Sequence, residues 1–197
     1  MTTTQATDNP GARWGHTFTY DPLRDEVLFF GGARERGSFL NDTWTWDGST
    51  WKHHGKPTPP HRGFAAAAFH TSRGTVLLHG GRGNDHATLS DTWEWDGNSW
   101  KKLEEKSSYQ SDHHQMVYIE HEKELMAFGG WNGQEQDVAG ETWKWDGIWK
   151  QITGDGPRKR AAFGMTYDSD QKRVILFGGL WINGQYADLW QWKDQSW

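Results

Sequence analysis

The sequence lacks cysteine altogether, which excludes disulfide scaffolds, thiolate metal sites and cysteine nucleophiles. It also lacks any apolar run approaching the ~18 residues of a membrane-spanning helix, so we expect no membrane association. The first ten residues are polar and contain no apolar stretch of the signal-peptide type, which leads us to expect a cytoplasmic location. Positive charge is not in excess, because the formal net charge is −5, and this argues against a general nucleic-acid-binding protein.

Hydrophobic residues are scarce as well, at 34% of the chain, a level that taken alone is typical of disordered segments. Aromatic residues are the exception, since the chain contains 15 Trp and 9 Phe together with 24 Gly. Disordered chains are poor in aromatic rings, whereas each buried Trp or Phe supplies a large apolar surface. We therefore expect a folded protein whose core is built mainly from rings.

Four copies of one pattern divide the sequence. In each copy a glycine pair follows an apolar run, and the pairs recur at a constant spacing of 49 residues. A motif of the type DTWTWDG follows each pair, and a single Trp follows each motif. The pairs are Gly31-Gly32, Gly80-Gly81, Gly129-Gly130 and Gly178-Gly179. A repeat of this length is typical of propellers and solenoids.

Each copy reads as four short strands. Val27 to Phe30 is a buried run that ends in glycine, Trp44 and Trp46 alternate at the period of a strand, and Asp47-Gly48 supplies a tight turn. No segment shows helical periodicity with caps. We predict one all-β domain over residues 1–197, with repeats at about 11–54, 60–103, 109–152 and 158–197 and with residues 1–10 as a leader or a closing strand.

These features resemble the kelch-repeat β-propeller family, over about residues 11–197. The shared motifs are the double glycine after an apolar strand, an aromatic residue in the third strand and a Trp that opens the fourth. The resemblance implies a propeller built of four-stranded blades. One departure is His79, which stands where the family has an aromatic or aliphatic residue before the glycines. We expect the third-strand Trp residues to pack between blades: Trp44, Trp93, Trp143 and Trp190.

The number of blades is unusual, because kelch propellers commonly have six or seven. Three arrangements are open: a four-bladed monomer, part of a longer propeller, or a homodimer that closes one eight-bladed ring. An open stack of four blades would leave aromatic faces exposed at both ends. Residues Thr2 to Gln5 are in register with the outer strand of the blades, so they could complete the last blade, in the same chain or in a partner's. We predict the homodimer.

Arginines recur at the position where the innermost strand of a repeat begins. They are Arg13, Arg62 and Arg160, with Ser111 in the third repeat. Kelch binding sites lie at this face, together with the residues after the glycine pairs, which include Arg34 and Arg82. Gathered at one mouth, these side chains could bind a carboxylate or phosphate in bidentate fashion. In the alternative, each arginine pairs with an acid of the repeat, such as Asp42, Asp91, Glu141 or Asp188.

Two loops repeat a Trp beside amide side chains: Trp131 and Asn132 in one, Trp181 and Asn183 in the other. An indole next to amides can stack on a sugar or peptide face while the amides orient the ligand. Asn-Gly is also a strong hairpin signal, so a plain turn is the alternative.

Histidines His16 and His114 occupy the same phase of the repeat and are candidates to line the channel. No histidine pattern points to a metal, and we expect no metal or other cofactor.

We find no nucleophile or phosphate-binding motif of a known enzyme class. The sequence therefore predicts a non-catalytic binding module whose arginine-rich mouth takes an acidic peptide, an acidic protein or a small anionic ligand. The alternative is a small kelch-type enzyme or carbohydrate binder, mutarotase-like or lectin-like, that uses the same mouth. No catalytic residue is assigned.

Overall fold

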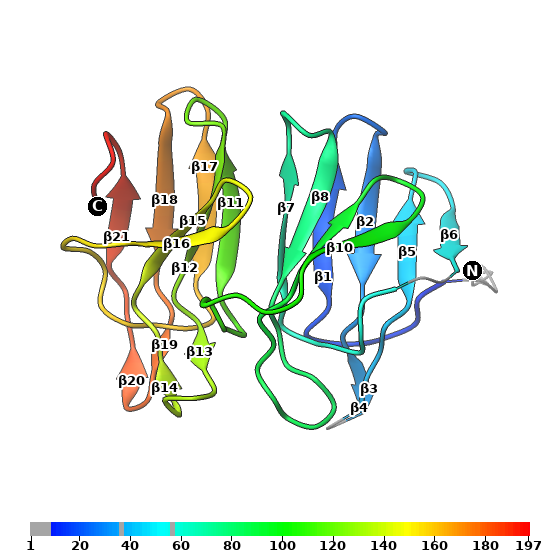
Figure 1. Cartoon of the computed structure of the whole chain (residues 1–197), viewed down its shortest axis with the longest axis horizontal. Coiled ribbons are helices and arrows are strands. Elements are labelled where there is room, and N and C mark those ends of the chain that lie inside the picture. The colour runs from blue at the N-terminus through cyan, green and yellow to red at the C-terminus, as the bar shows by residue number, and fades with distance from the viewer. Residues whose placement is uncertain (1–8, 36–37, 56–57) are drawn as a thin grey trace, which may run out of the picture.

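The protein is an all-β propeller of four blades, as the sequence predicts (Figure 1). The computed structural model describes residues 9–35, 38–55 and 58–197, and these contain no helix. Within each blade, neighbouring strands are antiparallel and follow one another along the chain. The Asp-Gly positions supply tight turns between the third and fourth strands, whereas a longer loop that begins at the glycine pair joins the second strand to the third.

The first two blades are complete four-stranded sheets. Blade 1 consists of β1 (Thr17–Asp21), β2 (Glu26–Phe30), β5 (Thr43–Trp46) and β6 (Trp51–His54). Blade 2 consists of β7 (Ala66–His70), β8 (Thr75–His79), β9 (Thr92–Trp95) and β10 (Trp100–Glu104).

The third blade is also complete, whereas the fourth has three strands. Blade 3 consists of β11 (Gln115–Ile119), β12 (Glu124–Phe128), β15 (Thr142–Trp145) and β16 (Trp149–Ile152). Blade 4 consists of β17 (Gly164–Asp168), β18 (Arg173–Phe177) and β21 (Leu189–Trp192).

Small hairpins follow the glycine pairs of three blades, all at the same end of the molecule (Figure 1). They are β3 (Ala33–Glu35) with β4 (Ser38–Phe39), β13 (Trp131–Asn132) with β14 (Asp137–Val138), and β19 (Leu180–Trp181) with β20 (Gly184–Gln185). In blade 2 the corresponding loop forms isolated bridges from Arg82 to Gly63 and Thr88. These loops define one face of the propeller, which we call the loop face.

The expectation of a fourth strand in every blade is not met in blade 4. The chain turns back after β21 through a bridge between Lys193 and Ser196. Trp197 still packs against blade 3, where its indole N–H donates to the hydroxyl of Thr142 at 2.8 Å. The segment Thr2 to Gln5, a candidate for the missing strand, lies outside the described residues.

Strand β8 shows how the blades bury both of their faces. Val76 and Leu78 on one face belong to a cluster with Leu28 and Phe30 of blade 1. Leu77 on the other face belongs to a cluster with residues of blade 3. An unbroken apolar strand is thus satisfied by neighbours on two sides, which explains why the alternation of an ordinary half-exposed sheet is absent here.

The Trp residues contribute both apolar surface and directional hydrogen bonds between blades. Trp93 lies in the cluster between blades 1 and 2, and Trp143 stacks on Tyr109. In blades 2 and 3 the Trp that opens the outer strand donates its indole N–H to a threonine hydroxyl of the preceding blade. These pairs are Trp100 with Thr43 at 2.9 Å and Trp149 with Thr92 at 3.0 Å.

The glycine pairs allow one blade's backbone to approach the next. Gly31 has a φ of +64°, and a Cβ at this position would lie 2.5 Å from the carbonyl oxygen of Arg62. Its neighbour Gly32 donates its N–H to that same carbonyl at 2.9 Å. Only glycine fits both the backbone conformation and the contact, so the recurrent pair is a packing requirement.

Truncation of an inter-blade Trp should be costly. Trp95 is only 1% exposed and packs with Trp100 against blade 1. We expect Trp95→Ala to lower the free energy of unfolding by about 3–5 kcal/mol, as for other large buried aromatics. Chemical denaturation followed by Trp fluorescence measures this. The matched control is Trp181→Ala, at 36% exposure, for which we expect a loss below about 1 kcal/mol. Equal losses in the two variants would contradict the blade packing.

Candidate functional site: the loop face between blades 2 and 3

The three in-phase arginines are buried structural residues. The side chains of Arg62 and Arg160 are fully buried, and that of Arg13 is nearly so. Each forms a bidentate ion pair with the acid of its own repeat. The pairs are Arg13 with Asp42 (2.6 and 3.0 Å), Arg62 with Asp91 (2.7 and 2.8 Å) and Arg160 with Asp188 (2.6 and 2.8 Å).

The same guanidinium groups also tie the ion pair to the glycine turn. Arg62 donates to the carbonyl of Gly80 at 2.9 Å, and Asp91 accepts a further hydrogen bond from the indole of Trp93 at 2.6 Å. Equivalent bonds occur in blades 1 and 4. In blade 3 the hydroxyl of Ser111 takes over the bond to the glycine carbonyl, at 2.8 Å from Gly129.

These contacts set the protonation of the acids. Burial alone would raise the pKa of Asp91, but the hydrogen bonds and charge of Arg62 outweigh it, and the pKa is lowered. The pKa of Asp42 is lowered in the same way by Arg13. For Asp188 the hydrogen bonds from Arg160 are the main cause of a lowered pKa. All three pairs are thus ionised and internally satisfied at neutral pH.

The expectation that Arg13, Arg62 and Arg160 present free guanidinium groups to a common ligand is therefore corrected. The alternative, in which each pairs with an acid of its repeat, is the one the hydrogen bonds show. Their physical role is to fix the glycine turn to the third strand of each blade.

Two arginines of the loop face remain accessible. Arg34 is exposed and donates to the carbonyl of Pro10 at 3.1 Å. Arg82 is partly exposed, and only its Nε is engaged, through a 3.0 Å bond to the carboxylate of Asp112. Its two terminal amino groups make no hydrogen bond to any residue that the structure describes.

Asp112 organises the surroundings of Arg82. It is completely buried, and its carboxylate accepts hydrogen bonds from Arg82, from the hydroxyl of Thr88 at 3.2 Å and from Nδ1 of His113. The ring of His113 stacks on Phe64 with centroids 3.7 Å apart. A buried carboxylate thus holds a cation in a fixed orientation, a condition for selective anion binding.

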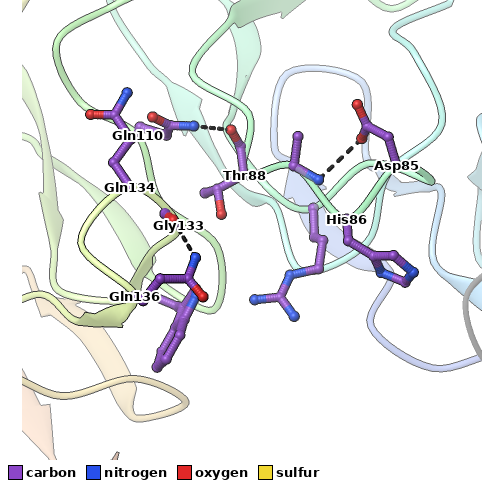
Figure 2. Close-up of a pocket in the computed structure, with 10 residues that line it drawn as sticks. Asp85, His86, Thr88, Gln110, Gly133, Gln134 and Gln136 are labelled. Atoms are coloured by element: carbon purple, nitrogen blue, oxygen red, sulfur yellow. Dashed lines mark hydrogen bonds between the residues drawn. The ribbon is translucent and has the colours of Figure 1, made fainter.

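A cavity of about 540 Å³ opens beside this cluster, between the loops of blades 2 and 3. Figure 2 shows Gln110, Gln134 and Gln136 on one side of Thr88, with Asp85 and His86 on its other side. Gln110 donates to the carbonyl of Thr88, which bridges the two blades. The remaining lining residues are Arg82, Ala87, Trp131 and Gly133. Its size is within the range of ~300–1,000 Å³ found for small-molecule sites.

A second, less polar cavity of about 300 Å³ adjoins the first. The two share Arg82 and Trp131, and the second extends past His113 to Ala162 and Leu180 of blade 4. A ligand could therefore place a polar end among the amides and an apolar end toward blade 4.

The two Trp-amide loops have different surroundings. Trp131 lines both cavities, whereas the side chain of Asn132 accepts the backbone N–H of Gln134 at 3.0 Å and builds the turn. Trp181 stacks on Tyr186 of blade 4, and Asn183 is exposed in the tip of its hairpin. The structure brings Arg82 and Trp131 together but leaves Trp181 and Asn183 outside both cavities.

The two in-phase histidines do not share an environment. His16 lies at the surface of blade 1 with one face of its ring stacked on Phe29, and this partial burial together with the charge of Arg13 lowers its pKa. His114 is buried between blades 2 and 3, beside His79 and Tyr109, so it does not line an open channel. Repeat phase predicted a common position, but blade 1 has no preceding blade to cover it.

Sequence reasoning missed most of the polar cavity lining. Thr88, Gln110 and Gln134 are not repeated in phase, and Gln136 recurs only once, as Gln185, so the 49-residue pattern gives little signal for them. Within the described parts of the chain, no group of three or more His, Asp or Glu residues is placed to hold a metal ion. No helix in the same residues is long and apolar enough to cross a membrane.

Comparisons with known proteins give no relative on which to base a function. No family model matches the chain, and no curated protein matches it. The site is therefore argued from its own geometry.

The buried imidazole of His79 should make the stability of the protein depend on pH. Its Nε2 faces the carbonyl of Tyr109 at 3.2 Å, so this nitrogen carries the proton, and Nδ1 accepts from Thr92 at 3.0 Å. Complete burial lowers the pKa of His79 to about 3. Because the unfolded chain takes up this proton near pH 6.5 and the folded chain does not, stability falls as the pH drops from about 6.5 toward 3.

Replacing the imidazole by the phenyl ring of the in-phase residues Phe30 and Phe128 removes this proton linkage. Between pH 6 and pH 4, we expect the free energy of unfolding to fall less steeply in His79→Phe than in the wild type, by up to about 1.4 kcal/mol per pH unit. Denaturation at several pH values measures the slope. The exposed His53→Phe is the matched control and should keep the wild-type slope. An unchanged slope in His79→Phe would contradict the neutral, buried imidazole.

Proposed function

We propose that this chain is a kelch-type propeller with a non-catalytic binding function, whose ligand is a small polar molecule carrying a carboxylate or similar anionic group. The observation that supports this most is the hydrogen bonding of the Arg82 guanidinium group. Its Nε is held by buried Asp112 while both terminal amino groups face no protein acceptor among the described residues. A pre-oriented guanidinium fork of this kind matches a planar carboxylate in bidentate geometry.

The rest of the cavity suits the uncharged part of such a ligand. Trp131 supplies an aromatic face, and the amides of Gln110, Gln134 and Gln136 supply donors and acceptors around it. Asp85 also lines the cavity and would repel a second anionic group on that side. A ligand with one anionic end and several hydroxyl groups, such as an acidic sugar, satisfies all of these groups.

A neutral carbohydrate is the second candidate, and the three amides around Trp131 favour it. The two candidates differ in what Arg82 contributes. An anion gains a charge-assisted bond that salt screens, whereas a neutral sugar binds with little dependence on salt. An acidic peptide would offer the same carboxylate chemistry as the anionic small molecule.

Calorimetric titration separates these ligands. Glucuronate, glucose and an oligo-glutamate peptide serve as probes, each at low and at high salt. We expect glucuronate to bind more tightly than glucose and its affinity to fall with salt. Arg82→Gln should weaken glucuronate at least tenfold, because a bond to a charged group is lost, while Arg34→Gln at the accessible arginine outside the cavity should leave it unchanged.

Glucuronate and glucose of equal affinity, unaffected by Arg82→Gln, would reject the anionic ligand and favour the neutral sugar. Thermal unfolding of Arg82→Gln checks the fold. Buried Asp112 loses its cationic partner in this variant, so its unfolding temperature should fall although Thr88 and His113 still hydrogen-bond Asp112, and binding is measured well below that temperature.

A further inference from the structure

The four blades form an arc rather than a closed ring. The inner strands pack in the order β1, β7, β11 and β17. No hydrogen bond among the described residues leads from blade 4 back to blade 1. In Figure 1 the outermost strands β6 and β21 lie at opposite ends of the long axis, so blades 1 and 4 point away from each other. Each of these two blades therefore has one face that no other blade covers.

The uncovered faces carry large apolar side chains at positions that are buried elsewhere in the repeat. Phe177 of blade 4 is 56% exposed, whereas Phe30 and Phe128 at the same phase are at most 1% exposed. On blade 1, Phe18 is 59% exposed, whereas the in-phase Met116 is buried. Exposed aromatic patches on two opposite faces are typical of interaction surfaces.

The internal interfaces define what such a surface would contact. Three backbone bonds run around the loop face and repeat by 49 residues: Phe64 N–H to Gly15, His113 N–H to Phe64, and Ala162 N–H to His113, at 2.7–3.0 Å. At the ends of this series, the N–H of Gly15 and the carbonyl of Ala162 have no partner among the described residues. The next member of the series would join Gly15 of one chain to Ala162 of another.

Side-chain contacts extend with the same register. Thr19 donates to the carbonyl of Ala67 in the next blade at 3.1 Å. Three repeats further along, at the open end of the arc, the corresponding residues are Thr166, exposed on blade 4, and Phe18, exposed on blade 1. The apolar packing between blades follows the same register. Met165 of blade 4 packs in one cluster with Phe128 of blade 3. Phe18 is in phase with Met165, and Phe177 is in phase with Phe128.

Tyrosine hydroxyls give a third repeated contact. Tyr118 bonds to Ser72 of the preceding blade at 2.6 Å, and Tyr167 bonds to His121 of its preceding blade at 2.9 Å. Tyr20 is in phase with these two tyrosines, so in a ring it would face residue 170 of the blade that precedes blade 1. Asp170 stands there in blade 4, and the Tyr20 hydroxyl, which donates to Asp25 of its own blade at 2.6 Å, could donate to Asp170 instead.

One residue departs from the repeat. Leu189 stands where Thr43, Thr92 and Thr142 each accept an indole N–H. The exposed side chain of Leu189 adds to the apolar face of blade 4. Because leucine cannot accept a hydrogen bond, the indole N–H of Trp51 would have no threonine hydroxyl to bond at this interface.

We infer that a second copy of this chain covers both faces, with blade 4 of each copy packed on blade 1 of the other in one eight-bladed ring. Both faces of the arc then continue an interface that already occurs three times within the chain. The arrangement is cyclic and head-to-tail around the ring, so each seam joins different surfaces. The cavity between blades 2 and 3 is complete in one copy, so this inference does not depend on the proposed function.

Light scattering of the chain at micromolar concentration tests the assembly. We expect twice the 22.7 kDa of a single chain. Phe18→Asp damages the blade 1 surface and Phe177→Arg damages the blade 4 surface, and each variant alone should be a monomer. Both positions are exposed in one copy, so the variants should keep the fold, which circular dichroism checks. Ile148→Asp, at a similarly exposed position of blade 3, is the matched control and should remain a dimer.

Mixing the two monomeric variants distinguishes the ring from other dimers. In a head-to-tail ring, the mixed dimer has one intact seam and one seam that pairs Asp with Arg, so dimers should reappear. A dimer that joins two identical faces would persist in one of the single variants, and the mixture would gain nothing. Either that result or a wild-type mass of one chain at high concentration would overturn the inference.

Discussion

A propeller blade has two apolar faces, and this requirement governs the rest of the structure. The strand Val76-Leu77-Leu78 is buried on both sides only because blade 1 and blade 3 flank it. Close stacking in turn demands glycine where Gly31 meets the backbone of Arg62. The arginine that provides this backbone contact also anchors its own blade through Asp91. Packing between blades, the glycine pair and the ion pair are therefore parts of one arrangement.

Features that repeat could be predicted from the sequence, and so the all-β propeller and its blades are confirmed. The role of the arginines could also have been found, because an acid recurs with them. Where Arg gives way to Ser111, the partner acid changes from Asp to Glu141 as well. This joint change indicates pairing within the repeat rather than a shared ligand. The position of Trp197 also follows from its repeat phase, because it makes the same indole bond to a threonine of the preceding blade as Trp100 and Trp149.

The candidate site lies where the repeat is broken. Arg82 was visible from its place after a glycine pair, but its significance depends on Asp112, a residue of the next blade. Gln110 and Thr88 meet across the same boundary. Contacts of this kind join loops of different length and composition, so no periodicity predicts them. A repeated framework thus carries a cavity that is not repeated, as is common for sites built on loops over a rigid scaffold.

The cavity and the open end of the arc are close enough to influence each other. Ala162 and Leu180 line the second cavity, and the carbonyl of Ala162 is also the acceptor that a second copy's Gly15 would reach. A blade 1 docked there would add a wall beside Leu180, which is now exposed. If docking of a second copy strengthens the binding of a ligand, the ligand strengthens the docking by the same factor. A ligand that extends from Arg82 toward blade 4 should therefore bind more tightly to the ring than to the arc, and should in turn stabilise the ring.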